Sequence, residues 1–223
     1  RTPKGRKGWA KEPLTPANLE AAAERGRAKL ADKPERLEAL EHEGRLRALI
    51  YRTLTLTGLR VGELRALQVR AFEVREGRAF LVLPAEDEKA ERGAELPLRA
   101  DLLAELEAWL GERLAAIRAE CRAAGGPIPA RLPADAPLLE VPEGLLRRFD
   151  RDAEAAGIPK HDDRGRTVCL HGLRHTFCSL MQAAGVPLRT AQEAMRHSKP
   201  ELTARMYTDP RLLDVAGAVA SLP

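Results

Sequence analysis

Histidine and arginine at helical spacing give this sequence its first chemical signal. His171 and Arg174 are three residues apart in the stretch HGLRHTF, so one face of a helix would carry both. Arginine can hold two phosphate oxygens with a bidentate hydrogen-bond fork, while histidine donates a hydrogen bond or carries a proton. Arg60 follows a glycine turn at a predicted helix start, where the helix dipole disfavours a cation, and this indicates an anionic partner. The alternative in each case is a surface arginine near a helix end.

Three further side chains could act on a bound phosphate. Tyr207 has polar neighbours, which predicts an accessible hydroxyl, whereas the other tyrosine, Tyr51, lies in an apolar helix and is expected in the core. His197 follows a predicted helix end, where it could equally cap backbone carbonyls. Lys89 lies in a charged turn, where a solvated loop lysine is the alternative.

A zinc site is a competing interpretation of the same region. Cys169, His171, His175 and Cys178 are four potential ligands, and the two histidines have metal-binding i,i+4 spacing. The order C-x-H-x3-H-x2-C matches no familiar zinc module, and the glutamate of the metalloprotease motif is absent. We therefore predict no metal site and no cofactor. Three cysteines in all are a sparse, odd set, which indicates a reducing compartment rather than a disulfide framework.

A helix-turn-helix is the second competing interpretation. Residues 171–196 could form two helices with Gly185 in the turn and residues 188–196 as the reading helix. Such a module would bind DNA without any chemistry.

The elements that must position these residues are mostly helices. Three short runs rich in β-formers, residues 69–74, 79–83 and 94–98, predict a small sheet beside a helical domain. Residues 124–142 contain two glycines and five prolines and predict an irregular loop. Apolar periodicity and cap residues predict helices at about 15–30, 34–57, 61–67, 101–121, 143–156, 171–184, 188–195 and 201–207.

Charge is unevenly distributed along the 223 residues. The first eleven residues hold five basic side chains and no acid, so the other 212 residues carry a net charge of −1 although the chain has +4. Contact with a polyanion must therefore be local. A first residue other than Met indicates a fragment, and no apolar run approaches the roughly 20 residues that cross a bilayer. We expect a soluble, cytoplasmic protein. The five basic residues among the first eleven are Arg1, Lys4, Arg6, Lys7 and Lys11.

Taken in order, these pieces resemble the catalytic domain of the tyrosine recombinases, or phage integrases, over about residues 14–215. The family stretch T-G-x-R-x-x-E-L is matched by Arg60 with Glu63 behind it. The family lysine in a hairpin before V-P-L is matched by Lys89 ahead of Leu96-Pro97-Leu98.

The resemblance continues in the last third of the chain. The stretch H-x-x-R-H is matched by His171, Arg174 and His175. The family tyrosine followed by threonine is matched by Tyr207-Thr208. The family stretch G-H-S is Arg196-His197-Ser198 here, so its small glycine is lost.

The resemblance implies a fold and a division of the chain. The fold would be mainly α with a small three-stranded antiparallel β-sheet, which is the DNA breaking–rejoining fold of integrase-type catalytic domains. Residues 1–13 would be the remnant of a basic interdomain linker, and residues 14–210 the catalytic domain. Residues 211–223 would be a C-terminal tail that can contact a neighbouring subunit, with packing onto its own domain as the alternative.

The resemblance also implies a metal-independent reaction. Tyr207 would attack a DNA phosphodiester and form a transient 3′-phosphotyrosyl link, followed by strand exchange and religation. Arg60, Arg174 and His197 would stabilise the charge on the phosphate, with His171 as general base and Lys89 as general acid. We expect two further residues, Glu63 and His175, to orient these groups.

The implied partner is double-stranded DNA. The basic first segment, Arg196 and Lys199 would contact it, and the protein would be associated with the nucleoid. The full-length protein would act as a tetramer on DNA and would carry an N-terminal DNA-binding domain that is missing here. The alternatives are a type IB topoisomerase-like nicking–closing enzyme and a non-catalytic helix-turn-helix protein.

Overall fold

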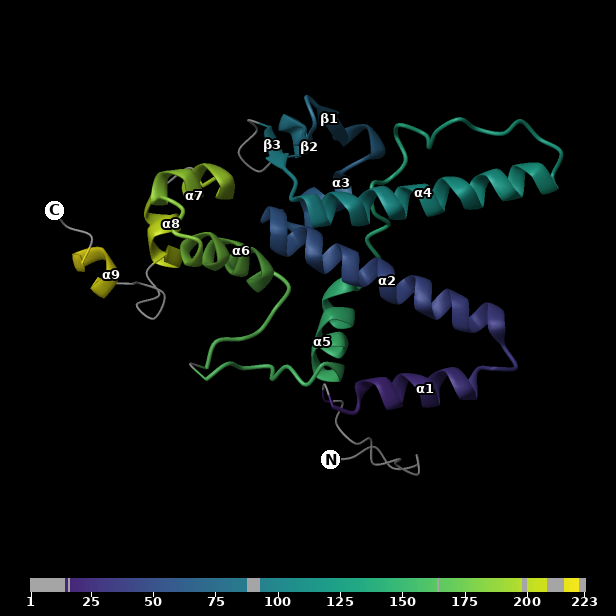
Figure 1. The fold of residues 1–223 in the computed structure, drawn as a ribbon, viewed down its shortest axis with the longest axis horizontal. Helices are drawn as coiled ribbons and strands as arrows, with labels where there is room; N and C mark the ends of the chain where they lie inside the picture. The colour runs from purple at the N-terminus through teal and green to yellow at the C-terminus, as the bar shows by residue number, and fades with distance from the viewer. Residues whose placement is uncertain are drawn as a thin grey trace. The chain divides into compact units, whose positions relative to one another are not determined.

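The structure is a computed structural model in which helices dominate and a small sheet is present (Figure 1). It describes residues 15, 17–87, 93–163, 165–197, 200–207 and 215–220. The chain divides into two compact units, one of residues 1–43 with 142–170 and one of residues 44–141 with 171–223. The predicted boundaries at 13/14 and 210/211 fall on residues outside this description and stay predictions.

The first unit contains helices α1 (Leu19–Lys29), α5 (Leu145–Ala155) and the first part of α2 (Pro34–Thr57). Arg27 of α1 pairs with Glu41 of α2 at 3.0 Å. Both side chains are about half exposed, and exposed pairs of this kind contribute less than about 1 kcal/mol.

The second unit contains the predicted sheet, which has the strand order β1-β2-β3 and is antiparallel throughout. Its strands are β1 (Phe72–Arg75), β2 (Arg78–Leu83) and β3 (Ala94–Pro97). The turn from β1 to β2 is formed by Glu76 and Gly77, which both have positive φ angles, of 51° and 73°. Positive φ at both central positions is typical of the type I′ turn, whose twist matches that of the strands it joins.

One predicted strand is shorter than expected. Residues Val69–Ala71 form a 3-10 helix, and the strand begins only at Phe72. The physical reason is that the Val69 and Arg70 amides bond to carbonyls of the 124–142 loop, at 2.8 and 3.0 Å, rather than to a neighbouring strand. A second 3-10 helix covers Ala85–Asp87.

Leucines make most of the core of the second unit. They come from the second part of α2, from α3 (Val61–Ala66), from the sheet and from α4 (Ala100–Ala123). Full burial of one such side chain stabilises the fold by about 1.5–3 kcal/mol. The 124–142 loop is irregular, as predicted, and Arg113 and Arg118 of α4 donate to its carbonyls. The largest fully buried side chains are Ile50, Leu54, Leu59, Leu64, Leu67, Leu81, Leu83, Leu102, Leu106, Leu138, Leu139 and Met195.

Helices α6 (Gly172–Ala183), α7 (Leu188–Met195) and α8 (Pro200–Tyr207) pack against one another in pairs (Figure 1). Gly185, with φ of 69°, makes the turn between α6 and α7. A short helix, α9 (Val215–Ala220), follows later in the chain. Among the helices described, none is long and apolar enough to span a bilayer. The predicted fold class, mainly α with a three-stranded antiparallel sheet, is confirmed.

Candidate active site

The site begins at the turn between α2 and α3. Gly58 has φ of 63°, and a Cβ there would lie 2.5 Å from the Phe177 ring of α6, so only glycine suits the position. Arg60 then caps α3, and its backbone amide donates to Glu63 Oε2 at 2.9 Å. The Arg60 guanidinium also donates to Glu63 Oε1. The Arg60 side chain is 30% exposed whereas the Glu63 side chain is 3% exposed. Arg60 is therefore held by a buried carboxylate and still reaches solvent.

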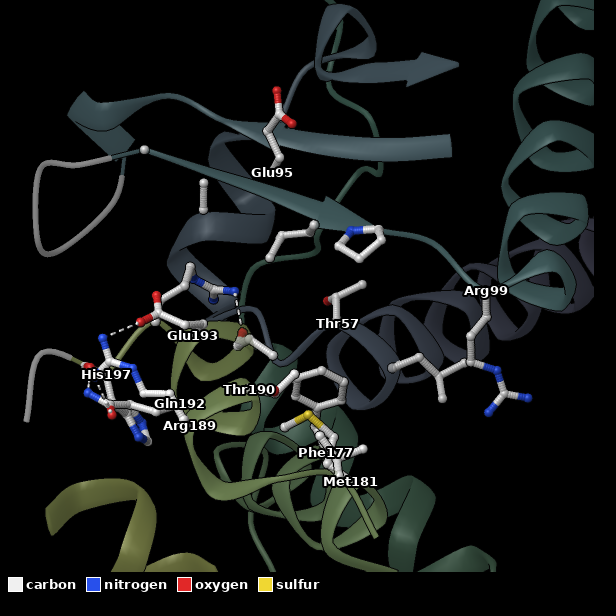
Figure 2. Close-up of a pocket in the computed structure, with 18 residues that line it drawn as sticks. Thr57, Glu95, Arg99, Phe177, Met181, Arg189, Thr190, Gln192, Glu193 and His197 are labelled. Carbon is white, nitrogen blue, oxygen red and sulfur yellow. Dashed lines mark hydrogen bonds and ion pairs between the residues drawn. The ribbon is translucent and has the colours of Figure 1, made fainter. Parts of the chain in front are cut away.

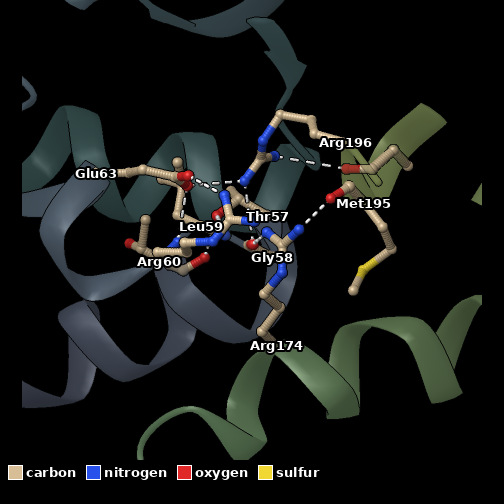
Figure 3. Close-up of polar contacts among 10 residues, drawn as sticks. Thr57, Gly58, Leu59, Arg60, Glu63, Arg174, Met195 and Arg196 are labelled. Carbon is tan, nitrogen blue, oxygen red and sulfur yellow. Dashed lines mark hydrogen bonds and ion pairs between the residues drawn. The ribbon is translucent and has the colours of Figure 1, made fainter. Parts of the chain in front are cut away.

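Arg174 joins this turn to the end of α7. Arg174 is 3% exposed, and its guanidinium donates to the carbonyls of Gly58 and Met195 (Figure 3). Burial lowers the pKa of Arg174 to about 10, with the charges of Arg196 and Arg60 acting in the same direction. The side chain therefore remains a cation at neutral pH.

Arg196 is a third arginine at the same place. It caps α7 with φ of 55° and ψ of 39°, a left-handed conformation that costs a non-glycine residue about 1 kcal/mol. Its Nη2 donates to Glu63 Oε2 at 2.9 Å and to the Gly58 carbonyl at 3.2 Å (Figure 3). The predicted DNA contact of Arg196 stays untested, but the structure places this side chain, 6% exposed, beneath the surface.

The Glu63 carboxylate carries the compensating negative charge. Burial raises its pKa, but the Arg60 amide and the charges of Arg196 and Arg60 outweigh burial and hold the pKa below its usual value. Glu63 is therefore ionised at neutral pH. It contacts Arg60 directly, and its predicted role in orienting that residue stays a prediction.

His197 follows α7, and both its ring and its backbone carbonyl form hydrogen bonds. Its Nδ1 lies 2.9 Å from the Thr203 hydroxyl of α8, and its carbonyl accepts the Gln192 side-chain amide at 3.1 Å. Burial lowers the pKa of His197 to about 4, assisted by the nearby charges of Arg174 and Arg60. The ring is therefore neutral at pH 7. When the Thr203 hydroxyl donates to Nδ1, the ring proton lies on Nε2.

Thr203 and Gln192 were not singled out from the sequence. Both are buried polar residues, on α8 and α7, and each reaches His197 through the fold rather than through a spacing that marks a motif. The one available signal was their position in or near the stretch 195–210, which already held His197 and Tyr207.

His171 and His175 lie at the start of α6. Their rings meet edge to face with centroids 5.3 Å apart. Burial lowers the pKa of His171, and the charges of Arg174 and Arg60 lower it further. His171 is therefore neutral at pH 7 and can accept a proton. In the part of the chain that is described, no three His, Cys, Asp or Glu side chains are grouped to hold a metal ion, so the zinc interpretation gains no support there.

Several predicted residues lie outside the description. Tyr207 is the last residue of α8, which packs on α6 and α7, but its side chain is among those not described. The same is true of Lys89, of Ser198 and Lys199, and of the whole basic segment 1–13.

Figure 2 shows a cavity of about 830 Å³ that His197 lines. Its lining comes from β3, the end of α2, α6 and α7, with Phe177 and Met181 among its apolar residues. His197 and Arg196 also line it, as does Gly93. Gly93, which precedes β3, therefore lines the same cavity as His197.

Comparison with known proteins gives this arrangement a family. The sequence profile described as "Phage integrase family" matches residues 33–212, most of the chain. The chain belongs to the phage integrase family. It is 33% identical over 64 residues to a "Tyrosine recombinase XerC-like" protein of Caldanaerobacter subterraneus subsp. tengcongensis, a match that covers 29% of this chain and 15% of that protein. The resemblance to the tyrosine recombinases is thereby confirmed.

Solved structures agree on the integrase fold. The chain is similar to XerA recombinase, with a TM-score of 0.57 and 20% identity over 86% of this chain and 62% of that one. It is also similar to XerH site-specific recombinase bound to palindromic difH substrate in a post-cleavage complex, with a TM-score of 0.55 and 21% identity over 80% and 46%. The chain spans less than two thirds of the length of each of these relatives.

Proposed function

We propose that this chain is the catalytic domain of a site-specific DNA recombinase that cuts with Tyr207. The observation that carries the proposal is the grouping of Arg60, Arg174 and His197 around one turn, although 137 residues separate the first from the last. Two cations and a neutral hydrogen-bond donor suit a phosphodiester whose free oxygens gain charge during attack.

The proposed reaction exchanges one phosphate ester for another. The Tyr207 oxygen bonds to phosphorus while the bond to the 5′ oxygen of DNA breaks. The phenol, with a reference pKa of about 10, must lose its proton as it attacks, and His171 accepts it because its lowered pKa keeps the ring neutral. Lys89 gives a proton to the departing 5′ oxygen. The phosphotyrosyl ester conserves the bond energy, so a second DNA end can reverse the step.

The arginines supply the charge stabilisation in this scheme. Arg60, the more exposed, and Arg174, the more buried, hold the two free oxygens, while His197 donates from Nε2. Their fixed positive charges take the role that a divalent cation has in many nucleases, so we propose that cleavage needs no metal. His175, edge to face with His171, holds that ring in place.

The remaining partner assignments are also proposals. Residues 1–13 and Lys199 contact the DNA backbone, so binding by this fragment is weak and falls with salt. In the longer protein, a DNA-binding domain precedes this one and four subunits assemble on DNA, in the cytoplasm at the nucleoid. A type IB topoisomerase-like activity is the second candidate, since the same tyrosine chemistry without partner exchange would relax DNA.

Trapping on nicked DNA tests the proposal. The full chain is incubated with a library of nicked duplexes of random sequence around the nick, and covalent protein–DNA adducts are isolated in denaturant. We expect adducts with the wild-type chain, in excess EDTA as well, and none with Tyr207→Phe, which keeps its DNA binding. An adduct that persists in Tyr207→Phe would remove Tyr207 from its role, and loss of activity in EDTA would contradict metal independence.

The same adducts separate the alternatives. Sequencing the trapped DNA shows whether one site is selected, as a site-specific recombinase requires. Relaxation of supercoiled plasmid without sequence preference would favour the topoisomerase-like activity. Binding with no adduct from the wild-type chain would favour a helix-turn-helix protein.

A further inference from the structure

Arg196 stands where the resemblance leads one to expect glycine, and its backbone is in the conformation that glycine favours. Its φ of 55° makes it one of two described non-glycine residues with positive φ, the other being Glu76 in the β1–β2 turn. A strained residue of this kind persists where its surroundings fix it by other contacts.

The two shorter hydrogen-bond contacts of the Arg196 side chain involve the site. Its side chain is 6% exposed, and its guanidinium reaches Glu63 Oε2 and the Gly58 carbonyl, across 133 and 138 residues of sequence (Figure 3). A weaker contact, at 3.5 Å, reaches the Ala194 carbonyl in its own helix. The guanidinium therefore joins the end of α7 to the α2–α3 turn.

Glu63 is held between two arginines. Arg60 donates to its Oε1 and Arg196 to its Oε2, so each arginine sets the position of the carboxylate that the other contacts. A buried carboxylate with one of two cationic partners removed has less compensation for its burial and turns toward the partner that remains. The direction of the Arg60 guanidinium therefore depends on Arg196.

We propose that Arg196 is a positioning residue, which fixes Arg60 through Glu63 without touching DNA. This inference rests on the proposed function, because it assigns Arg60 to the scissile phosphate. It differs from the sequence prediction for Arg196, which was a direct contact with DNA.

Electrostatics support the same role. The charged and titratable groups around Arg196 are Glu63 and Arg60 from α3 and its cap, Arg174 from α6, and His197 next in the chain. The pKa of His197 is lowered most by burial, then by the charges of Arg174 and Arg60, and then by the charge of Arg196. Removing that charge should let His197 become protonated at higher pH.

The test is the single-turnover rate of adduct formation at saturating DNA, on a duplex selected from the nicked library. Arg196→Gly removes the guanidinium and relieves the left-handed strain. We expect it to lower the rate about tenfold or more while DNA affinity changes by less than about twofold, since the side chain is buried. Arg196→Lys, which keeps a charge for Glu63, should fall between. Arg122→Gly, an exposed arginine in the last turn of α4, is the control of equal charge loss and should keep the wild-type rate.

Two further readouts separate positioning from general damage to the fold. The pKa of His197, followed by NMR titration, should rise in Arg196→Gly, whereas a smaller folded fraction would leave the pKa of the folded protein unchanged. Glu63→Gln and Arg196→Gly combined should be no slower than the slower single variant, because both interrupt one chain of contacts. Circular dichroism checks each variant, and Arg196→Lys carries the test where Arg196→Gly is unfolded.

Three results would overturn the inference. An unchanged rate in Arg196→Gly means that Arg60 is positioned without it. A loss of affinity with a normal rate at saturation means that Arg196 contacts DNA. Additive effects in the double variant mean that it does not act through Glu63. If the wild-type chain forms no adduct, the proposed function itself is wrong, and that result is distinct from these three.

Discussion

A single carboxylate, that of Glu63, organises the charged residues of the site. It is buried and accepts bonds from the Arg60 amide and from the guanidiniums of Arg60 and Arg196. Charge-assisted bonds of this kind are stronger than neutral ones, and breaking such a buried set costs about 3–5 kcal/mol. The residue that the sequence marked as an orienting group is thus also one that holds the local fold together.

His197 makes a residue-scale prediction about pH. Its pKa is about 4 in the folded chain because of burial and nearby cations, against about 6.5 when unfolded. Protonation of His197 therefore favours the unfolded chain, so the part of the unfolding free energy that depends on a neutral His197 is complete above about pH 6.5 and is lost as the pH falls toward 4. We expect the thermal unfolding midpoint to fall more steeply between about pH 7 and 4.5 for the wild type than for His197→Asn. Parallel curves for the two proteins would contradict the prediction.

At the scale of elements, the α2–α3 turn does more than connect two helices. The Gly58 carbonyl accepts bonds from Arg174 of α6 and Arg196 of α7, and the Phe177 ring of α6 covers the glycine itself. One turn therefore contacts both α6 and the residue that caps α7. The spacing between Arg60 and Arg174 is a property of this junction.

Gly58→Ala tests the junction. The added Cβ would meet Phe177 and would have to adopt a positive φ, so we expect a loss of about 1–3 kcal/mol in the free energy of unfolding. The adduct rate should fall further than the folded fraction, because the Gly58 carbonyl moves. Gly125→Ala is the matched control, with φ of 66° but nothing within 4 Å of the new Cβ. It should cost about 1 kcal/mol and leave the rate unchanged. Similar unfolding curves and rates for both variants would contradict this account.

Element order was predictable from sequence because it depends on local signals. Apolar periodicity located α2 and α4, and the Gly185 turn separated α6 from α7, as the structure confirms. The shortened strand at Val69 was not predictable, since its amides bond to a loop more than 60 residues later. The Glu63–Arg196 contact was not predictable either, because 133 residues of sequence separate the two and only packing brings the end of α7 to α3.

At the scale of the whole molecule, the C-terminal segment makes a prediction about assembly. Helix α9 is built from small apolar residues, and its Val219 is 62% exposed. Burial of such a helix on a second subunit would remove this apolar surface from water. We expect light scattering to show self-association of the full chain on DNA and a monomer once residues 211–223 are deleted. Equal masses for the two chains would mean that the tail packs on its own domain.

The cluster at Gly58 also determines how much positive charge the site presents to a bound anion. Three guanidiniums and one carboxylate leave its described groups at a net charge of +2, with His171 and His197 neutral at pH 7. A phosphodiester brings one negative charge, and the pentacoordinate species formed during attack carries two. On the proposed function, these described groups therefore carry more positive charge than one phosphodiester neutralises, which favours the more negative species formed during attack.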